Sequence, residues 1–478
     1  MNDREVREAL EHNPTDHEAT TLTPIDVLPD TQEIITLLSE KKYAAVVEKT
    51  NGIPAADLVE LFDEIPREYQ SIFFRILPKE MASEVFILID TPLQEAIISA
   101  FTDNEVASML EELYLDDTVD IIEEMPAYLV KKILRNSTPD NRSKINDLLK
   151  YPKDSAGTIM TPEYVRFVGN MTVEAALNHI RRVAIDKETI YTCYVTDKFR
   201  HLEGIVTAKQ LLISPLDVTL DEIMERSLVY VNTTDDKEEV ANKFNKYGFL
   251  ALPVVDTENR LVGIVTVDDA IDVISEEVEE DFAKMAAITP TETTYLKTSA
   301  FGIFKSRIPW LLLLMISATF SSTILNRFES VLPAVLILFV PMLMDTGGNS
   351  GGQSSVTIIR GISLGELYMS DIIRVFWKEV RVGIACGVTL GAVAFGKILL
   401  VDRLIMNNPE VTLMVAFIVA LTLMLSVVMA KVIGSSLPIL AKRLGFDPAV
   451  MASPFITTIV DALALVIYFF ISSALLGI

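Results

Sequence analysis

Two carboxylates lie inside long apolar stretches near the C-terminus, where an unpaired charge is costly. Asp461 is the only charged side chain among residues 449–478 and ends the segment SPFITTIVD. Insertion scales give roughly 2.5–3.5 kcal/mol for an Asp at the centre of a membrane helix, so we expect Asp461 to face a bundle interior or a pore. Thr457 and Ser453 precede it by one and two helical turns and add hydroxyl oxygens. A buried, hydrogen-bonded structural Asp is the alternative interpretation.

The other carboxylate, Asp345, lies in the segment PMLMDTGGNSGGQSS over 341–355, four residues before Asn349. Four glycines and a carboxylate fit poorly in a helix that faces lipid, which predicts a break that lines protein or a water-filled path. Unwound backbone carbonyls together with Asn and Asp side chains supply hard oxygen ligands of the kind that suit Mg²⁺ or Ca²⁺. The alternative is a close contact between helices at small residues.

A third group of carboxylates lies in a predicted helix just before the apolar half of the chain. Residues three and four apart share a helix face, so Asp269, Asp272 and Glu276 stack on one side. Like charges at this spacing repel unless a cation or a basic partner neutralises them. A solvated acidic surface is the alternative. The whole run consists of Asp268, Asp269, Asp272, Glu276, Glu277, Glu279, Glu280 and Asp281.

The elements that must position the two apolar-segment carboxylates are five long apolar stretches. Each is long enough to cross a hydrocarbon core of about 30 Å as a helix. Basic residues such as Lys305, Arg381 and Lys442 gather in the segments that five crossings from a cytosolic N-terminus place inside. We therefore predict a multi-pass, all-α domain in the cell membrane, with the C-terminus extracytoplasmic. The stretches are 308–325, 331–359, 375–401, 411–440 and 449–478.

An internal repeat precedes the membrane stretches. IMTP at 159–162 is followed 45 residues later by GIVT at 204–207, and IMER at 223–226 is followed 40 residues later by GIVT at 263–266. Between these landmarks each copy has a helix, an extended apolar run, a turn and another strand, which predicts a tandem pair of small α/β modules. Short amphipathic patterns punctuated by proline over 31–149 predict an all-α helical superhelix before them.

The charge balance limits the class of protein. Residues 305–478 hold 12 Lys+Arg and 9 Asp+Glu, so the remainder of the chain carries a net charge near −28. An acidic front half joined to an apolar back half favours cation handling beside a membrane and argues against nucleic acid, which needs a basic face. The two cysteines offer neither a disulfide framework nor a thiol-rich metal site. No nucleophile triad, P-loop or zinc motif appears, so we do not expect an enzyme.

The repeated modules resemble cystathionine-β-synthase-type (CBS) domains, which pair and often bind adenine nucleotides or ions. CBS domains with a nucleotide site tend to carry Thr or Ser three residues before an Asp after the last strand, and Thr266 with Asp269 fits that pattern. The resemblance implies ATP at the pair, with the Asp269 carboxylate accepting ribose hydroxyls. The first copy has Thr207 and Gln210 at these positions. A pair that only packs and transmits strain is the alternative.

The order of regions and the two membrane motifs resemble the MgtE family of magnesium channels. The resemblance implies a homodimer in membrane lipid with the pore on its two-fold axis, between the second and fifth spans. Asp461 corresponds to the family's pore aspartate and Asn349 to its glycine-rich pore segment. The implied pore ligands for Mg²⁺ are Asp461, Thr457, Ser453, Asn349 and Asp345. The implied domains are a flexible acidic tail over 1–30, a helical N domain over 31–150, CBS domains over 151–218 and 219–275, an acidic plug-like linker helix over 276–304, and a transmembrane domain of five helices over 305–478.

The same resemblance implies closure of the pore by cytosolic Mg²⁺ that bridges carboxylates of separate domains. Asp116 and Asp120 correspond to the N-domain ligands, and their counterparts are Asp269, Asp272, Glu277, Glu280 and Asp281. The competing function is a secondary transporter that exchanges Mg²⁺, Mn²⁺ or Co²⁺ for H⁺ or Na⁺. Because we find no His or Glu chain inside the spans, the sequence favours the channel. A membrane-anchored nucleotide sensor without transport would leave the two polar spans unexplained.

Overall fold

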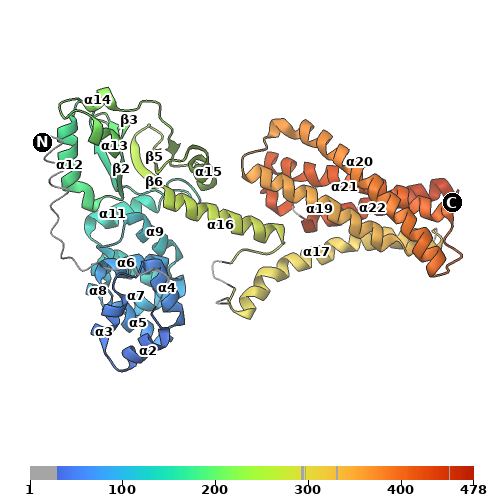
Figure 1. Cartoon of the computed structure of the whole chain (residues 1–478), viewed down its shortest axis with the longest axis horizontal. Helices are drawn as coiled ribbons and strands as arrows, with labels where there is room; N and C mark the ends of the chain where they lie inside the picture. The colour runs from blue at the N-terminus through green and yellow to red at the C-terminus, as the bar shows by residue number, and fades with distance from the viewer. Residues whose placement is uncertain (1–28, 292–294, 297, 330–331, 452, 478) are drawn as a thin grey trace, which may run out of the picture. The chain divides into compact units, whose positions relative to one another are not determined.

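The computed structural model describes residues 29–291, 295–296, 298–329, 332–451 and 453–477. They form two compact units, and the strands and helices of each are shown in Figure 1. The first unit comprises the described residues of 29–153, 160–226 and 260–264, and the second comprises those of 154–159, 227–259 and 265–477. The predicted acidic tail over 1–30 lies, except for its last two residues, outside the described residues.

Short helices fill the region before the repeat, as the punctuated pattern predicts. Pro54, Pro66 and Pro78 are N-cap residues. Ile65 and Leu77, which precede two of these prolines, are extended and buried, because a following proline disfavours helical backbone. Pro66 and Pro78 therefore each end one helix and begin the next. The helices are α2 (Thr31–Ser39), α3 (Tyr43–Thr50), α4 (Ala55–Glu64), α5 (Arg67–Ile76), α6 (Lys79–Leu88), α7 (Thr91–Ala100), α8 (Asp103–Leu110), α9 (Leu115–Glu124), α10 (Ala127–Asn136) and α11 (Pro139–Leu148).

The repeat folds as two α/β modules with a three-stranded sheet each, which confirms the predicted tandem pair. In the first module β1 pairs parallel with β2, and β2 pairs antiparallel with β3. The first module consists of β1 (Tyr164–Phe167), α12 (Val173–Val183), η1 (Ala184–Asp186), β2 (Thr189–Thr196), β3 (Leu202–Thr207) and α13 (Ala208–Ile213). The second consists of α14 (Leu220–Ile223), β4 (Val231–Asn232), α15 (Lys237–Tyr247), β5 (Ala251–Val255), β6 (Leu261–Thr266) and α16 (Val267–Met285).

The repeated IM and GIV motifs pack crosswise between the modules. A Cβ at Gly204 would lie 2.4 Å from the Met224 sulfur, and one at Gly263 would lie 2.7 Å from the Met160 sulfur. Thr161 forms a β-bridge with Ile264, on the same strand as Gly263. Each methionine therefore packs on the glycine of the other copy, so the two modules are built as one interlocked pair.

The predicted linker helix over 276–304 is wrong in both of its bounds. A capping box between Thr266 and Asp269 begins α16 at Val267, directly after β6. The helix ends at Met285, and Ala287 has a left-handed φ of 52°, which ends helical backbone. Among the described residues between 286 and 299 there is no helix. The acidic helix α16 is therefore a continuation of the second module.

Long helices follow α16, and we call α17 to α22 the membrane bundle. Within the described residues, four stretches are long and apolar enough to cross a membrane: 300–328, 369–405, 413–443 and 448–476. The helix α19 has 24 residues, but its glycines and polar residues keep it out of this apolar set. The elements are α17 (Ala300–Glu329), α18 (Ala334–Ile337), α19 (Val340–Ser363), η2 (Met369–Asp371), α20 (Ile372–Lys397), the π-helical η3 (Ile398–Ile405), α21 (Leu413–Arg443), η4 (Pro448–Met451) and α22 (Ser453–Leu476).

The predicted break in the glycine-rich segment is wrong, because α19 is one continuous helix from Val340 to Ser363. Its glycines lie against neighbouring helices. A Cβ at Gly348 would lie 2.7 Å from the Thr457 methyl carbon, and one at Gly434 would lie 2.2 Å from the Gly351 carbonyl oxygen. Close backbone approach therefore explains the glycines, as in the small-residue alternative, and the helical carbonyls are not freed as ion ligands.

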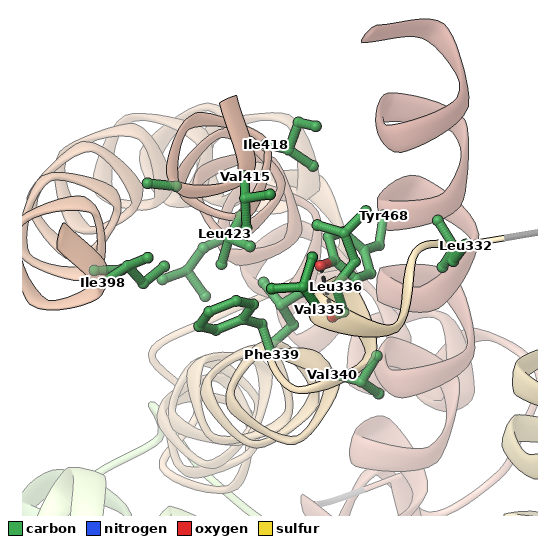
Figure 2. Packing of buried hydrophobic residues seen from close by; sticks show 14 of the residues in the cluster. Leu332, Val335, Leu336, Phe339, Val340, Ile398, Val415, Ile418, Leu423 and Tyr468 are labelled. Carbon is green, nitrogen blue, oxygen red and sulfur yellow. Dashed lines mark hydrogen bonds between the residues drawn. The ribbon is translucent and has the colours of Figure 1, made fainter. Parts of the chain in front are cut away.

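One end of the membrane bundle is held by an apolar cluster from α18 to α22 (Figure 2). Leu336 and Phe339 before α19 pack with Ile398, Val415 and other buried side chains of the cluster. The Tyr468 hydroxyl donates a hydrogen bond to the Leu336 carbonyl oxygen over 2.8 Å, drawn in Figure 2. This contact satisfies a carbonyl at the short α18 turn and fixes the start of α19 against α22.

Candidate functional site

Helix α19 presents an exposed stripe of polar side chains next to the face on which its glycines pack. Asp345 and Asn349 are exposed in the chain, and the Asn349 amide donates a 3.2 Å hydrogen bond to Asp345 Oδ1. Gln353 and Thr357 continue the exposed stripe at intervals of four residues. Glycines on the neighbouring face pack against α21 and α22, which leaves the polar stripe uncovered in the chain.

Helix α22 brings the second carboxylate close to the first. Asp461 is half-buried, and its Oδ1 is buried without a hydrogen-bond partner among the described residues. Asp345 lies near enough for the two negative charges to repel one another. Thr457, one turn earlier on α22, packs its methyl group against Gly348. Ser453 is the first residue of α22, and its side chain lies outside the described residues.

The structure thus brings Asp345, Asn349, Thr457 and Asp461 together from two adjacent helices. Two carboxylates, an amide and a hydroxyl are oxygen donors that suit a hard divalent cation. A buried carboxylate oxygen without a protein partner normally needs water or an ion. The arrangement can attract a cation through its charge and orient first-shell waters through its oxygens.

The acidic helix α16 touches the membrane bundle at its C-terminal end. Ser363 is the last residue of α19, and its hydroxyl donates a 2.8 Å hydrogen bond to Asp281 Oδ2 of α16. The Lys284 ammonium lies 2.6 Å from Glu280 and 2.5 Å from Asp447, which follows α21. Displacing the end of α16 would therefore pull on both α19 and α21.

Carboxylates outnumber lysines around this end of α16. Burial and the negative charge of Glu238 raise the pKa of Glu277 to about 7, although Lys237, 4.0 Å away, acts in the opposite direction. Burial is also the first cause that raises the pKa of Asp281, and the charge of Asp447 adds to it. A divalent cation would relieve this repulsion more effectively than one proton would.

The N-terminal half of α16 carries the two remaining predicted ligands. Burial raises the pKa of Asp269 to about 6 against the opposing hydrogen bond from Thr266, and burial with the charge of Glu276 raises the pKa of Asp272. The Thr266 hydroxyl donates a 2.5 Å hydrogen bond to Asp269 Oδ2. In the first module Thr207 and Gln210 form the same capping box. The Thr-x-x-Asp pattern therefore begins a helix in its own right, whether or not a nucleotide binds.

The predicted N-domain ligands differ in their surroundings. Asp116 is buried in α9, 7% exposed, whereas Asp120 is exposed. Carboxylate oxygens of Asp116, Glu163 and Glu188 all lie within 4.8 Å of one another, a spacing that can hold a metal ion. Burial raises the pKa of the neighbouring Tyr114 phenol, and the charges of Glu188, Glu163 and Asp116 raise it further. Asp116 and Asp120 belong to the first unit and α16 to the second.

Several functional candidates were missed by the sequence analysis. Glu163 and Glu188 each precede a strand, and the parallel pairing of Tyr164 with Thr189 places them side by side. Knowledge of that strand register would have identified them, but the register cannot be read from the sequence alone. Glu238 lies in α15 and Asp447 in the loop between α21 and η4, so they join the cluster only through tertiary packing. A buried lysine of the bundle, Lys431, was missed as well.

A multi-pass membrane protein with CBS modules and paired intramembrane carboxylates is a cation transport protein by class. Family models match the chain in three parts: "MgtE intracellular N domain" over 53–154, "CBS domain" over 156–216 and 220–276, and "Divalent cation transporter" over 340–471. The chain therefore belongs to the MgtE family of divalent cation transporters, which are not enzymes.

Curated relatives match over most of their length. The chain is 38% identical to "Magnesium transporter MgtE" of Thermus thermophilus, over 92% of this chain and 97% of that protein. It is 31% identical to the protein of the same description from Bacillus subtilis, over 92% of this chain and 96% of that protein. The solved cytosolic domain of the Mg²⁺ channel MgtE in complex with ATP is 38% identical, with a TM-score of 0.49, over 51% of this chain and 99% of that one.

Proposed function

We propose that the protein takes up Mg²⁺ through the cell membrane along a path lined by α19 and α22. The observation that carries the proposal is the meeting of Asp345, Asn349 and Asp461, with a buried Asp461 oxygen that has no partner among the described residues. The magnesium relatives, identical at 38% and 31% over nearly the whole chain, support the choice of ion.

The ion passes largely hydrated, because Mg²⁺ loses its waters reluctantly. Asp461 and Asp345 attract it by charge, while Asn349 and Thr457 orient its water shell. The membrane potential drives the movement inward by about 2.3 kcal/mol per charge for each 100 mV. Because this potential alone drives the cation inward, no coupled ion is needed for uptake. The N-terminus is cytosolic and the C-terminus extracytoplasmic.

The functional unit is a homodimer. The stripe of Asp345, Asn349, Gln353 and Thr357 is exposed in one chain, and polar side chains of this kind do not face lipid in a membrane. A second copy that sets its own α19 stripe opposite encloses a polar path and doubles the carboxylates. Lipid then covers the apolar side chains that remain exposed, such as those of α17.

Cytosolic Mg²⁺ closes the path. Crowded carboxylates at the end of α16 repel one another, and α16 contacts the ends of α19 and α21 through Asp281 and Lys284. When Mg²⁺ is abundant, it holds the closed arrangement. It binds to Glu277, Glu280 and Asp281, and also to the group of Asp116, Glu163 and Glu188 together with Asp120. ATP binds at Thr266 and Asp269, where the Asp269 carboxylate would accept hydrogen bonds from the ribose hydroxyls.

The competing function, an exchanger of divalent cations for H⁺ or Na⁺, is favoured by one observation. The membrane bundle contains further titratable groups, among them Glu379 and the buried Lys431. The Ser354 hydroxyl donates a hydrogen bond to the Glu379 carboxylate and accepts one from the Lys431 ammonium. A single Glu beside a lysine is not the chain of titratable side chains that an exchanger would use as a relay. These groups lie between helices on the glycine side of α19, away from the Asp345 stripe, which supports the channel as the first choice.

The test is Mg²⁺ influx into proteoliposomes for the wild type and Asp461→Ala, under imposed voltage and over a range of Na⁺ and pH gradients. We expect influx that requires Asp461, follows the voltage and ignores both gradients. Influx that stops when the Na⁺ or H⁺ gradient is removed would establish the exchanger. Unchanged influx in Asp461→Ala would place the path elsewhere in the bundle.

A further inference from the structure

A buried cation lies in the middle of the membrane bundle, on the side of α19 away from the exposed carboxylates. Lys431 of α21 is 5% exposed. A lysine ammonium within a bilayer is expensive unless oxygens and a negative charge compensate it. A packing role alone would be served by an apolar side chain, so the presence of an ammonium here needs a reason.

The compensating groups come from two other helices. The Lys431 ammonium donates hydrogen bonds to the Ser354 hydroxyl over 3.3 Å and to the Ser350 carbonyl oxygen over 3.4 Å, both on α19. The Ser354 hydroxyl in turn donates a 2.6 Å hydrogen bond to Glu379 Oε2 on α20. Ser354 thus lies between one buried positive charge and one half-buried negative charge, and three helices share the network.

The network lies where α19 and α21 come closest. A Cβ at Gly434, one turn after Lys431, would lie 2.2 Å from the Gly351 carbonyl oxygen, and one at Gly351 would lie 3.1 Å from the Ala430 carbonyl oxygen. The Lys431 hydrogen bonds to Ser350 and Ser354 lie beside this close backbone contact, so their loss would remove polar anchors that hold α19 against α21 there.

Rotation of α19 here would move the other face of the same turns. Ser350 directly follows Asn349, whose amide holds Asp345. The anchored carbonyl and the ion-facing amide are therefore on adjacent residues of one rigid helix. A rotation of one residue position, about 100° for an α-helix, would carry Asn349 from the polar stripe to a helix contact.

We propose that Lys431 is a positioning residue, which together with Ser354 and Glu379 fixes the rotation of α19 and so sets the cation path on its neighbouring face. The inference rests on the proposed path along α19. Its chemistry is that of a charge-balanced bridge: one ammonium, one carboxylate and one hydroxyl that donates to the carboxylate and accepts from the ammonium. The bridge involves no transfer of a proton.

The test compares Lys431→Met, Glu379→Gln and the double variant with the wild type, measuring Mg²⁺ influx per folded protein and the thermal midpoint in detergent. Lys431→Met leaves Glu379 uncompensated, so we expect the midpoint to fall and influx to drop at least about tenfold. In the double variant no unpaired charge remains, so we expect the midpoint to recover while influx stays low, because α19 is no longer anchored. Lys431→Arg, which keeps the charge, should retain more influx than Lys431→Met.

Full recovery of influx in the double variant would overturn the proposal, since charge balance alone would then account for the network. If Lys431→Met does not fold, Ser354→Ala keeps both charges and removes the bridge. It should lower influx by about threefold to tenfold, or raise the half-saturating Mg²⁺ concentration. The matched control is Ser435→Ala, a fully buried serine on α21 whose hydroxyl bonds only to the Val432 carbonyl of its own helix.

Equal influx in Ser354→Ala and Ser435→Ala would contradict the positioning role. The Asp461→Ala protein separates the two proposals. If it keeps full influx while Lys431→Met does not, the path is misplaced and the network still controls transport. If it loses influx while the network variants keep theirs, the path stands and the positioning role fails.

Discussion

The acidic helix α16 and the membrane bundle use carboxylates in opposite ways. At the end of α16, Glu277, Glu280 and Asp281 are crowded together and lysines lie among them. In the bundle, the Asp345 and Asp461 carboxylates lie near enough to repel one another, and neither forms an ion pair with a described basic side chain. The backbone around them is held by glycine contacts instead.

The difference shows that the residues around a carboxylate determine which function it can serve. Carboxylates between partly buried lysines gain or lose a cation with small changes in position, which suits sensing. Carboxylates on a rigid, tightly packed helix keep their separation, which suits repeated passage of one kind of ion. Rigidity should therefore matter most in the bundle and charge should matter most at α16.

The largest effect should follow a change in the bundle's packing. In Gly434→Ala the new Cβ would lie 2.2 Å from the Gly351 carbonyl oxygen, a backbone atom that cannot turn away. We expect the thermal midpoint in detergent to fall by several degrees and Mg²⁺ influx to drop more than about tenfold, because overpacking of this kind costs about 1–3 kcal/mol or more. The matched control is Gly396→Ala on α20, whose Cβ would meet no atom within 4 Å. Equal stability of the two variants would mean that the α19 and α21 backbones are not held at this distance.

A smaller effect, of opposite sign, should follow a change in the charges at α16. With Glu277→Gln and Asp281→Asn combined, Mg²⁺ loses two ligands that hold the closed arrangement. We expect influx at high internal Mg²⁺ to rise by about threefold to tenfold, with the influx at low internal Mg²⁺ unchanged, since allosteric couplings are typically about 1–3 kcal/mol. Asp217→Asn, an exposed carboxylate outside this cluster, serves as the control. Unaltered inhibition by internal Mg²⁺ in the double variant would remove α16 from the gating mechanism.

An effect of similar size should be the pH dependence of this inhibition. Glu277 has its pKa raised to about 7 and Asp269 to about 6, so protons compete with Mg²⁺ as the pH falls through this range. We expect the half-inhibiting Mg²⁺ concentration to rise by about tenfold from pH 8 to pH 6, because a carboxyl with a pKa of about 7 is then about nine-tenths protonated. Protection from trypsin by Mg²⁺ at each pH is the measurement.

The same shift has a consequence for stability without Mg²⁺. A folded-state pKa above the ordinary value means that the folded state holds the proton more tightly than the unfolded state does. Stability should therefore decrease as the pH rises from about 4.5 toward 7 and level off above it. Glu277→Gln should flatten both this profile and the pH dependence of inhibition. A profile that keeps its slope in that variant would assign the titration to another group.

Composition, periodicity and motifs were enough to predict most of the secondary structure and the order of the regions. Regular prolines and amphipathic spacing determined the helical region, and two copies of IM and GIV determined the paired modules, because local propensity and burial act over short distances. The apolar stretches determined the membrane helices for the same reason. Asp345 and Asp461 could be singled out because an intramembrane carboxylate is rare and costly wherever it occurs. Their grouping with Asn349 and Thr457 in one pore came from the family resemblance.

Only the tertiary structure decided how those residues are supported. Whether the glycines of α19 break the helix or pack it depends on what faces them, and Thr457, Ala430 and Gly434 lie on other helices. The group of Asp116, Glu163 and Glu188 depends on a strand register, and the bridge from Lys431 through Ser354 to Glu379 depends on three helices meeting. A sequence fixes which side chains are available, but contacts between distant residues arise from packing, which no local pattern records.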